Sequence, residues 1–129
     1  MNVEAGTVLP ELRVEVTPTF VISTALATRD FQDVHHDRDS AVRRGSKDIF
    51  VNILTTNGLV QRYVTDWAGP EAQVRSCAIR LGVPCYAYET LTFTGQVTQV
   101  ADGECTVEVV GRNSVGAHVT GTVRLAVAS

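Results

Sequence analysis

The second half of the chain alternates apolar and polar residues with a period of two, the pattern of β-strands that bury one face. Asp102-Gly103 and residues 113–116 supply turn residues between the later runs. We therefore predict successive antiparallel strands from residue 73 onwards. The apolar positions that define the four strands are Cys77, Ile79, Leu81 and Val83, then Leu91, Phe93 and Val97, then Cys105, Val107 and Val109, and finally Val119, Val123, Leu125 and Val127.

The first half of the chain contains shorter elements. Residues 19–28 fit two interpretations, because their β-branched side chains favour a strand whereas the preceding Thr17 and Pro18 are typical of a helix cap and first turn. The other predicted elements are a short strand around residues 12–16, a polar loop over residues 29–38 and a short helix over residues 40–44 that Gly45 ends.

Residues 50–67 are predicted to form the one long helix, and Gly69-Pro70 is typical of a helix stop. One long, nearly uncharged helix followed by antiparallel strands is the element order of a hotdog fold. We therefore expect a single α+β hotdog domain over residues 1–129, in which an antiparallel sheet wraps around the central helix. The apolar residues of that helix recur every three to four positions, at Phe50, Ile53, Leu54, Val60, Tyr63, Val64 and Trp67.

Composition and charge narrow the classes of function. The 129 residues are 44% apolar and 19% charged, as in ordinary globular proteins. The 11 basic and 14 acidic residues are dispersed, so we expect no nucleic-acid partner. The uncharged stretch 49–61 is too short to span a bilayer, and no export signal is recognisable, so we expect no membrane association and a cytoplasmic location. The three cysteines form no CxxC pair, which favours a reducing compartment over a disulfide framework.

The polar run from Arg29 to Ala41 holds two of the three histidines and four acidic residues between apolar segments. On composition alone, a solvated turn and a reactive loop fit this run about equally well. The spacing of its acidic residues and histidines favours the reactive loop. Asp30 and His35 are five residues apart, and Asp37 follows two residues later.

This spacing resembles the signature of the MaoC-like, R-specific enoyl-CoA hydratases, whose loop reads Asp-x-Asn-Pro-x-His-x-Asp with an alanine four residues later. Residues 50–54 lie over the family's Ile-x-His-Gly-Leu at the start of its central helix. Residues 84–91 resemble the family's Pro-Val-x-Pro-Gly-Asp-Thr-Leu. The chain departs from the pattern at three pairs, which are Gln32-Asp33 for Asn-Pro, Asn52-Ile53 for His-Gly and Ala87-Tyr88 for Pro-Gly.

Within this family, the sequence of residues 29–37 is most similar to that of the small subunit of two-subunit bacterial steroid side-chain hydratases. In that branch a MaoC-like partner completes a double hotdog and supplies most contacts to CoA. The resemblance implies a heterodimer or heterotetramer acting on an acyl-CoA, with a homodimer as the alternative. An exposed edge strand of a lone hotdog sheet would also need such a partner.

The resemblance assigns the chemistry to Asp30 and His35 jointly. A carboxylate and an imidazole on one loop can hold a single water over the β-carbon of a 2-enoyl-CoA thioester and move its proton. The backbone N–H of Ile53 would then stabilise the enolate oxygen. Candidates for lining the substrate site are Asn52, Asn57 and His36. We expect neither a metal nor a separate cofactor, since CoA is part of the substrate.

Several alternatives remain open. A hotdog acyl-CoA thioesterase would share the fold and the CoA, and a non-catalytic partner subunit or a binding module would keep the fold without chemistry. The run His35-His36-Asp37 fits a metal site poorly, because adjacent histidines point apart and no further ligand cluster follows. Structural roles are expected at Asp37 as the cap of the short helix, at Tyr63 and Trp67 in the core, and at His118.

Overall fold

A computed structural model describes residues 2–127, so residues 1, 128 and 129 of the predicted domain lie outside the described part. Its elements are β1 (Val8–Glu15), α1 (Pro18–Ala27), the 3₁₀ turn η1 (Asp33–His35), α2 (Arg38–Arg43), α3 (Ile53–Ala68), β2 (Gln73–Leu81), β3 (Thr90–Ala101), β4 (Glu104–Arg112) and β5 (Ala117–Ala126).

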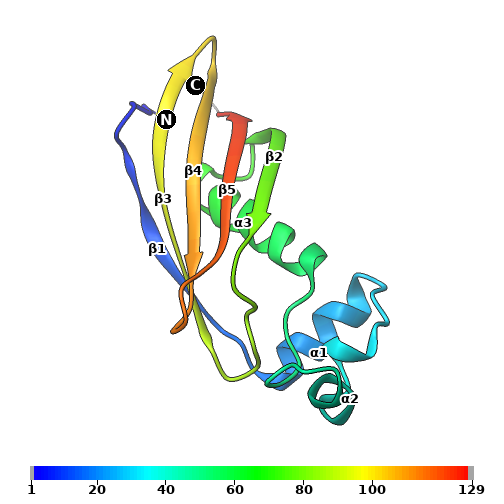
Figure 1. The fold of residues 1–129 in the computed structure, drawn as a ribbon. Helices are drawn as coiled ribbons and strands as arrows, with labels where there is room; N and C mark the ends of the chain where they lie inside the picture. The colour runs from blue at the N-terminus through cyan, green and yellow to red at the C-terminus, as the bar shows by residue number, and fades with distance from the viewer. Residues whose placement is uncertain (1, 128–129) are drawn as a thin grey trace.

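The strands form a five-stranded sheet in the order β1-β3-β4-β5-β2, and every neighbouring pair is antiparallel. The long helix α3 packs against one face of this curved sheet (Figure 1). The shorter helices α1 and α2 lie together at one end of the molecule, beside the start of α3 (Figure 1). This arrangement confirms the predicted hotdog architecture.

The core forms where α3 meets the inner face of the sheet. Val60 and Val64 of α3 have no exposed surface, and neither do Leu91 and Phe93 of β3. Burial of each such side chain contributes about 1.5–3 kcal/mol to folding. The alternation predicted for the interior strands β4 and β5 is confirmed, since their inward residues Cys105, Val107, Val109, Val119, Val123 and Leu125 are all buried. Val127, predicted to continue the last strand, lies beyond the end of β5.

The edge strand β2 departs from the predicted pattern. Cys77 and Ile79 are only half-buried, and Leu81 is 43% exposed. Val83 lies beyond the end of the strand. Because β2 pairs with β5 on one side only, its apolar face is covered less completely than those of the central strands.

The predicted start of the long helix is wrong by three residues. Phe50 forms a bridge with Tyr86, and the N–H of Val51 donates to the carbonyl of Cys85 at 3.0 Å. The apolar spacing extends back to Phe50, but the strand-like pairing of residues 50 and 51 satisfies their backbone instead. At the other end the predicted stop is confirmed, because Gly69 adopts a φ of 96° directly after the helix.

The structure settles residues 19–28 as the helix α1. Thr17 Oγ1 accepts a hydrogen bond from the N–H of Phe20 at 3.0 Å, and Pro18 is the first helical residue. The cap and the proline therefore outweigh the β-branched side chains. The expected cap of α2 is confirmed too, since Asp37 Oδ1 accepts from the N–H of Ser40 at 3.1 Å.

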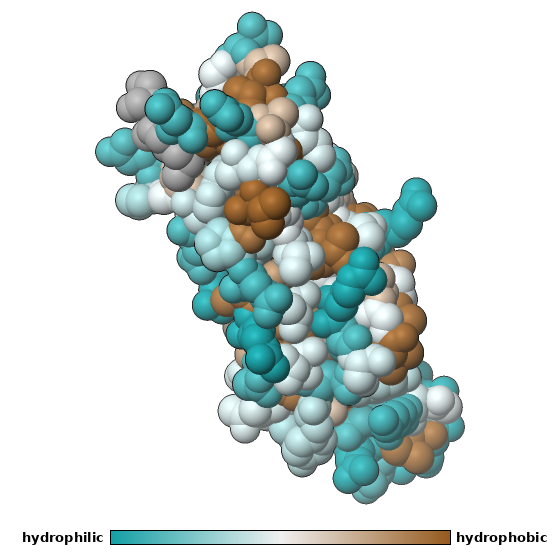
Figure 2. Space-filling view, turned by 90° about the vertical axis from the view of Figure 1, so that its left-hand side faces the viewer, coloured by the Kyte–Doolittle hydropathy of each residue, from teal (hydrophilic) through white to brown (hydrophobic). Residues whose placement is uncertain are grey.

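The surface beside β1 carries small hydrophobic patches separated by hydrophilic side chains (Figure 2). This face of the molecule is therefore mixed in polarity. Within residues 2–127, none of the helices is both long enough and apolar enough to cross a membrane.

Tyr88 has an unfavourable backbone conformation just before β3. Its φ is 75°, in the left-handed region that favours glycine, and its side chain is 77% exposed. The N–H of Tyr88 donates to the carbonyl of Val16 at 2.6 Å, which holds the turn in place. The family pattern has glycine at this position, as noted above, so the tyrosine incurs a strain that the glycine avoids.

We predict that Tyr88→Gly stabilises the protein by about 0.5–1 kcal/mol. The relief of about 1–2 kcal/mol of left-handed strain exceeds the entropic cost of a new glycine. Urea denaturation measures the free energy of unfolding. Tyr86→Gly is the control and should destabilise, because Tyr86 lacks a positive φ and packs edge-on against Phe50. A Tyr88→Gly protein no more stable than the wild type would contradict the strain argument.

Candidate active site

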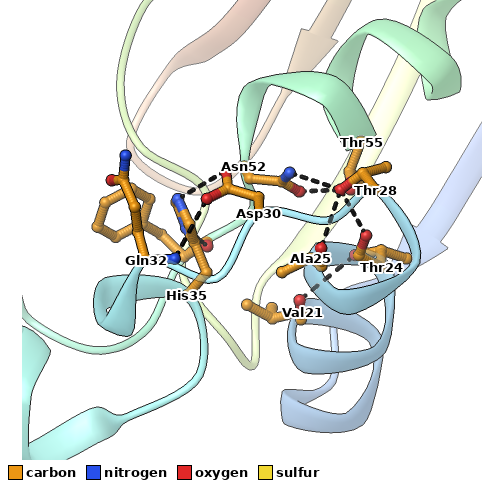
Figure 3. Close-up of polar contacts among 10 residues, drawn as sticks. Val21, Thr24, Ala25, Thr28, Asp30, Gln32, His35, Asn52 and Thr55 are labelled. Carbon is orange, nitrogen blue, oxygen red and sulfur yellow. Dashed lines mark hydrogen bonds and ion pairs between the residues drawn. The ribbon is translucent and has the colours of Figure 1, made fainter.

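The polar loop after α1 brings Asp30 and His35 together (Figure 3). Arg29 turns the chain with a φ of 57°, and the N–H of Asp30 then donates back to the carbonyl of Ala25 at 2.9 Å. His35 lies in the 3₁₀ turn that follows. As a result His35 Nε2 is 3.4 Å from Asp30 Oδ2. The two side chains are 7% and 18% exposed, so both are sheltered from bulk water.

The orientation of the His35 ring is fixed by the backbone before α3. His35 Nδ1 is 2.8 Å from the carbonyl oxygen of Phe50. A carbonyl oxygen can only accept a hydrogen bond, so Nδ1 is the protonated ring nitrogen and donates to it. The ring also packs edge-on against the Phe50 ring, with centroids 4.9 Å apart. Nε2 is therefore the nitrogen that faces Asp30. At 3.4 Å the two groups are close enough to bind the same water.

A cavity of about 300 Å³ opens beside this pair. This volume is at the lower end of the range of roughly 300–1,000 Å³ for small-molecule sites. Its polar lining comes from Asp30, Gln32, His35 and His118, and its apolar lining from Phe50, Val51, Ile53, Leu81, Gly82, Val83 and Pro84.

The start of α3 is part of the same cavity. Ile53 is the first residue of the helix and lines the cavity, and the side chain of the N-cap residue Asn52 makes no capping hydrogen bond. The first N–H groups of a helix have no partner within the helix, and the helix dipole favours negative charge there. The arrangement can therefore stabilise an anionic oxygen beside the Asp30–His35 pair.

The three candidates for lining the substrate site lie elsewhere. Asn52 is 1% exposed and its side chain is bonded to Thr28 and Thr55. Asn57 Oδ1 accepts from Gln61 at 2.9 Å. His36 is exposed on the outside of the loop. None of the three belongs to the lining of the cavity.

His118 lines the cavity, although its position in the sequence marks it only as a strand residue. Its Nδ1 donates to the carbonyl of Val83 at 2.7 Å, and its Nε2 therefore accepts from Thr56 Oγ1 at 2.8 Å. Both ring nitrogens are occupied, which confirms a structural role for this side chain. Burial lowers the pKa of His118 below its usual value, and the hydrogen bond to Val83 only partly opposes this effect.

The loop is anchored on its outer side by Asp33, which replaces the proline of the family pattern. Its carboxylate accepts from the hydroxyl of Ser40 and from Arg44 at 3.2 Å. The hydrogen bond from Ser40 is the main reason why the pKa of Asp33 lies below its usual value, and the charge of Arg44 adds to the effect. Among residues 2–127, His, Cys, Asp and Glu side chains form no group of three or more that could hold a metal ion.

Comparisons with known proteins show which proteins share this sequence and fold. No model of a known protein family matches the chain. The chain is 71% identical over 120 residues to the 3-oxo-4,17-pregnadiene-20-carboxyl-CoA hydratase beta subunit of Mycobacterium tuberculosis, covering 93% of each protein. It matches a chain in the crystal structure of the ChsH1–ChsH2 complex from the same organism with a TM-score of 0.96 and 68% identity, covering 99% and 100% of the two chains. The (R)-hydratase from A. caviae involved in PHA biosynthesis has the same fold, with a TM-score of 0.90, 17% identity and 98% coverage of each chain.

We predict that the protein loses stability as the pH falls below about 6.5. The unfolded chain takes up a proton on His118 near pH 6.5, its ordinary pKa, whereas the folded chain keeps this side chain neutral to a lower pH. His118→Gln keeps a donor for Val83 and an acceptor for Thr56 but cannot titrate. Urea denaturation at about pH 7.5 and about pH 5.5 should therefore show a smaller loss for His118→Gln than for the wild type. The exposed His36→Gln is the control, and an equal loss in all three proteins would refute the prediction.

Proposed function

Because the chain belongs to the MaoC-like enoyl-CoA hydratase family, we propose that it is the beta subunit of a steroid side-chain hydratase. It adds water across the α,β double bond of a 2-enoyl-CoA thioester. The observation that carries this proposal is the approach of His35 Nε2 to Asp30 Oδ2 at the edge of an open cavity. Hydration requires a water held over the β-carbon, a proton for the α-carbon and stabilisation of the enolate oxygen.

Asp30 and His35 provide the first two requirements together. One water bridges the carboxylate and Nε2, and its oxygen is directed at the β-carbon from one side of the double bond. The pair removes a proton from this water and returns a proton to the α-carbon on the same face. The hydrogen bond to the carbonyl of Phe50 keeps the other ring nitrogen protonated throughout. We assign the two proton transfers to the pair jointly.

The N–H of Ile53 provides the third requirement. Negative charge develops on the thioester oxygen as water adds, and a donor at the start of α3 stabilises this charge more strongly than the neutral carbonyl. Loss of one such donor typically lowers turnover by about 10²- to 10³-fold. The family glycine is replaced here by isoleucine, but the backbone N–H is present in both.

The rest of the substrate needs a second subunit. The cavity of this chain holds little more than the reacting end of a steroid acyl-CoA, and Ile53 and Leu81 remain 52% and 43% exposed at its rim. The similar chain in the ChsH1–ChsH2 complex is seen with another subunit. We propose that a MaoC-like partner completes the site of this chain and contributes most contacts to CoA. The reaction needs no cofactor beyond the CoA of the substrate, and the free thiols of the chain support a cytoplasmic location.

We predict that Asp30→Asn and His35→Ala each lower hydration by about 10²- to 10⁴-fold, since each removes one of the two groups that hold and deprotonate the water. The variants are co-purified with the partner subunit, and loss of the absorbance of the conjugated enoyl thioester measures turnover. Asp66→Asn is the matched control, because Asp66 is an exposed carboxylate of α3 paired with Arg62. Size-exclusion chromatography checks that every variant still assembles.

Each competing function has its own outcome in this experiment. Unchanged hydration by the Asp30 and His35 variants would show that this chain is a non-catalytic partner subunit. Release of free CoA thiol without hydration would identify a thioesterase. A complex with neither activity on any 2-enoyl-CoA would overturn the enzyme assignment.

We predict that Ile53→Pro lowers the turnover number by about 10²- to 10³-fold with little change in stability. Proline lacks an N–H but is well tolerated at the first position of a helix, and Asn52 already has the extended conformation that a following proline requires. Ile53→Ala shortens the same side chain but keeps the N–H, so it should retain most of the turnover. Equal losses in both variants would assign the effect to the side chain and contradict the role of the N–H.

A further inference from the structure

Side-chain hydrogen bonds join the start of α3 to the end of α1, close to the reacting groups but not in contact with the cavity (Figure 3). Asn52 Nδ2 donates to Thr28 Oγ1 at 2.8 Å, and Asn52 Oδ1 accepts from Thr55 Oγ1 at 2.5 Å. Asn52 is only 1% exposed, so water does not compete for its amide.

The bridge pairs each donor with an acceptor. The amide nitrogen of Asn52 faces Thr28 and its amide oxygen faces Thr55. The hydroxyl of Thr28 donates to the carbonyls of Thr24 at 2.8 Å and Ala25 at 3.1 Å, so its oxygen accepts the hydrogen bond from Asn52. Because every polar atom of the Asn52 amide has a buried partner, the bridge holds the two helix ends together.

The position of Asn52 makes this use of its amide unusual. An asparagine at an N-cap normally accepts a hydrogen bond from an N–H in the first turn of its own helix. Asn52 makes no such bond and instead directs its amide across to α1. The N–H groups at the start of α3 consequently stay uncapped, and their distance from α1 is fixed.

The two ends of the bridge carry the two halves of the proposed chemistry. Thr28 ends α1 two residues before Asp30, and Asn52 directly precedes Ile53. We propose that Asn52, acting through Thr28, is a positioning residue that sets the separation between the carboxylate of Asp30 and the N–H of Ile53. This inference rests on the proposed hydratase function. It concerns a residue that contacts neither the water nor the thioester.

The test measures turnover of the complete complex with Asn52→Ala, Thr28→Val and the double variant. A misplacement of about 1 Å can lower turnover by about 10²-fold, so each single variant should lower kcat by about 10- to 100-fold with a smaller change in KM. Because both residues act through one bond, the double variant should lose no more than the worse single variant. Thr65→Val is the matched control, since Thr65 Oγ1 also donates to the carbonyl four residues earlier but lies farther along α3.

Thr28→Ser provides a second readout, the rescue of turnover by a conservative variant. Serine keeps the hydroxyl oxygen that accepts from Asn52, whereas the valine of Thr28→Val keeps the shape of the side chain but lacks this oxygen. Thr28→Ser should therefore retain most of the wild-type kcat. A loss of kcat in Thr28→Ser as large as that in Thr28→Val would contradict the bridge.

The outcomes separate this inference from the proposed function. If the wild-type complex hydrates its substrate and the Asn52 and Thr28 variants keep wild-type kcat, the positioning role is overturned. A lower melting temperature with unchanged kcat would overturn it as well. If the wild-type complex shows no hydration, the proposed function fails, and crystal structures then test the bridge directly. An Asp30 that stays in place in Asn52→Ala would overturn the positioning role, and a displaced Asp30 would support it.

Discussion

The hydrogen bond from His35 Nδ1 to the carbonyl of Phe50 is the contact on which the site depends. This carbonyl is free to accept because residues 50 and 51 are extended and pair with Tyr86 and Cys85. Had the helix begun at Phe50, its carbonyl would accept from the N–H four residues later, and His35 would lose its partner. The short extended segment before α3 therefore fixes the tautomer of His35 and the nitrogen that faces Asp30.

The two buried histidines of the chain illustrate how local partners determine what an imidazole can do. His118 has both nitrogens occupied, by Val83 and by Thr56, and joins the loop beside the cavity to α3. Burial lowers its pKa below the usual value, which favours the neutral ring. His35 has only one nitrogen occupied by the backbone, and the other faces a carboxylate and the cavity. Within residues 2–127, every buried side-chain nitrogen and oxygen has a hydrogen-bond partner. The hydrogen bonds therefore hold the polar groups around the site in fixed positions.

The departures from the family pattern acquire physical explanations in the structure. Asp33 in place of proline anchors the loop through Ser40 and Arg44. Asn52 in place of histidine joins α3 to the end of α1. Tyr88 in place of glycine is the exception, since its strained and exposed conformation is explained by nothing within this chain.

Local patterns in the sequence predicted the interior strands and the existence and end of the long helix, because periodicity and turn residues are local features. The pairing of Asp30 with His35 was implied by the family resemblance, which the spacing of the two residues within one short loop carries. The helix α1 is an intermediate case, because its Thr17 cap and Pro18 are local signals that the sequence could not weigh against the β-branched residues. The start of α3 at Ile53, and the wall of the cavity that His118 forms with residues 81–84, became evident only in the folded chain. Both depend on hydrogen bonds or packing between residues far apart in the chain, and no local pattern shows which partner a backbone carbonyl will find.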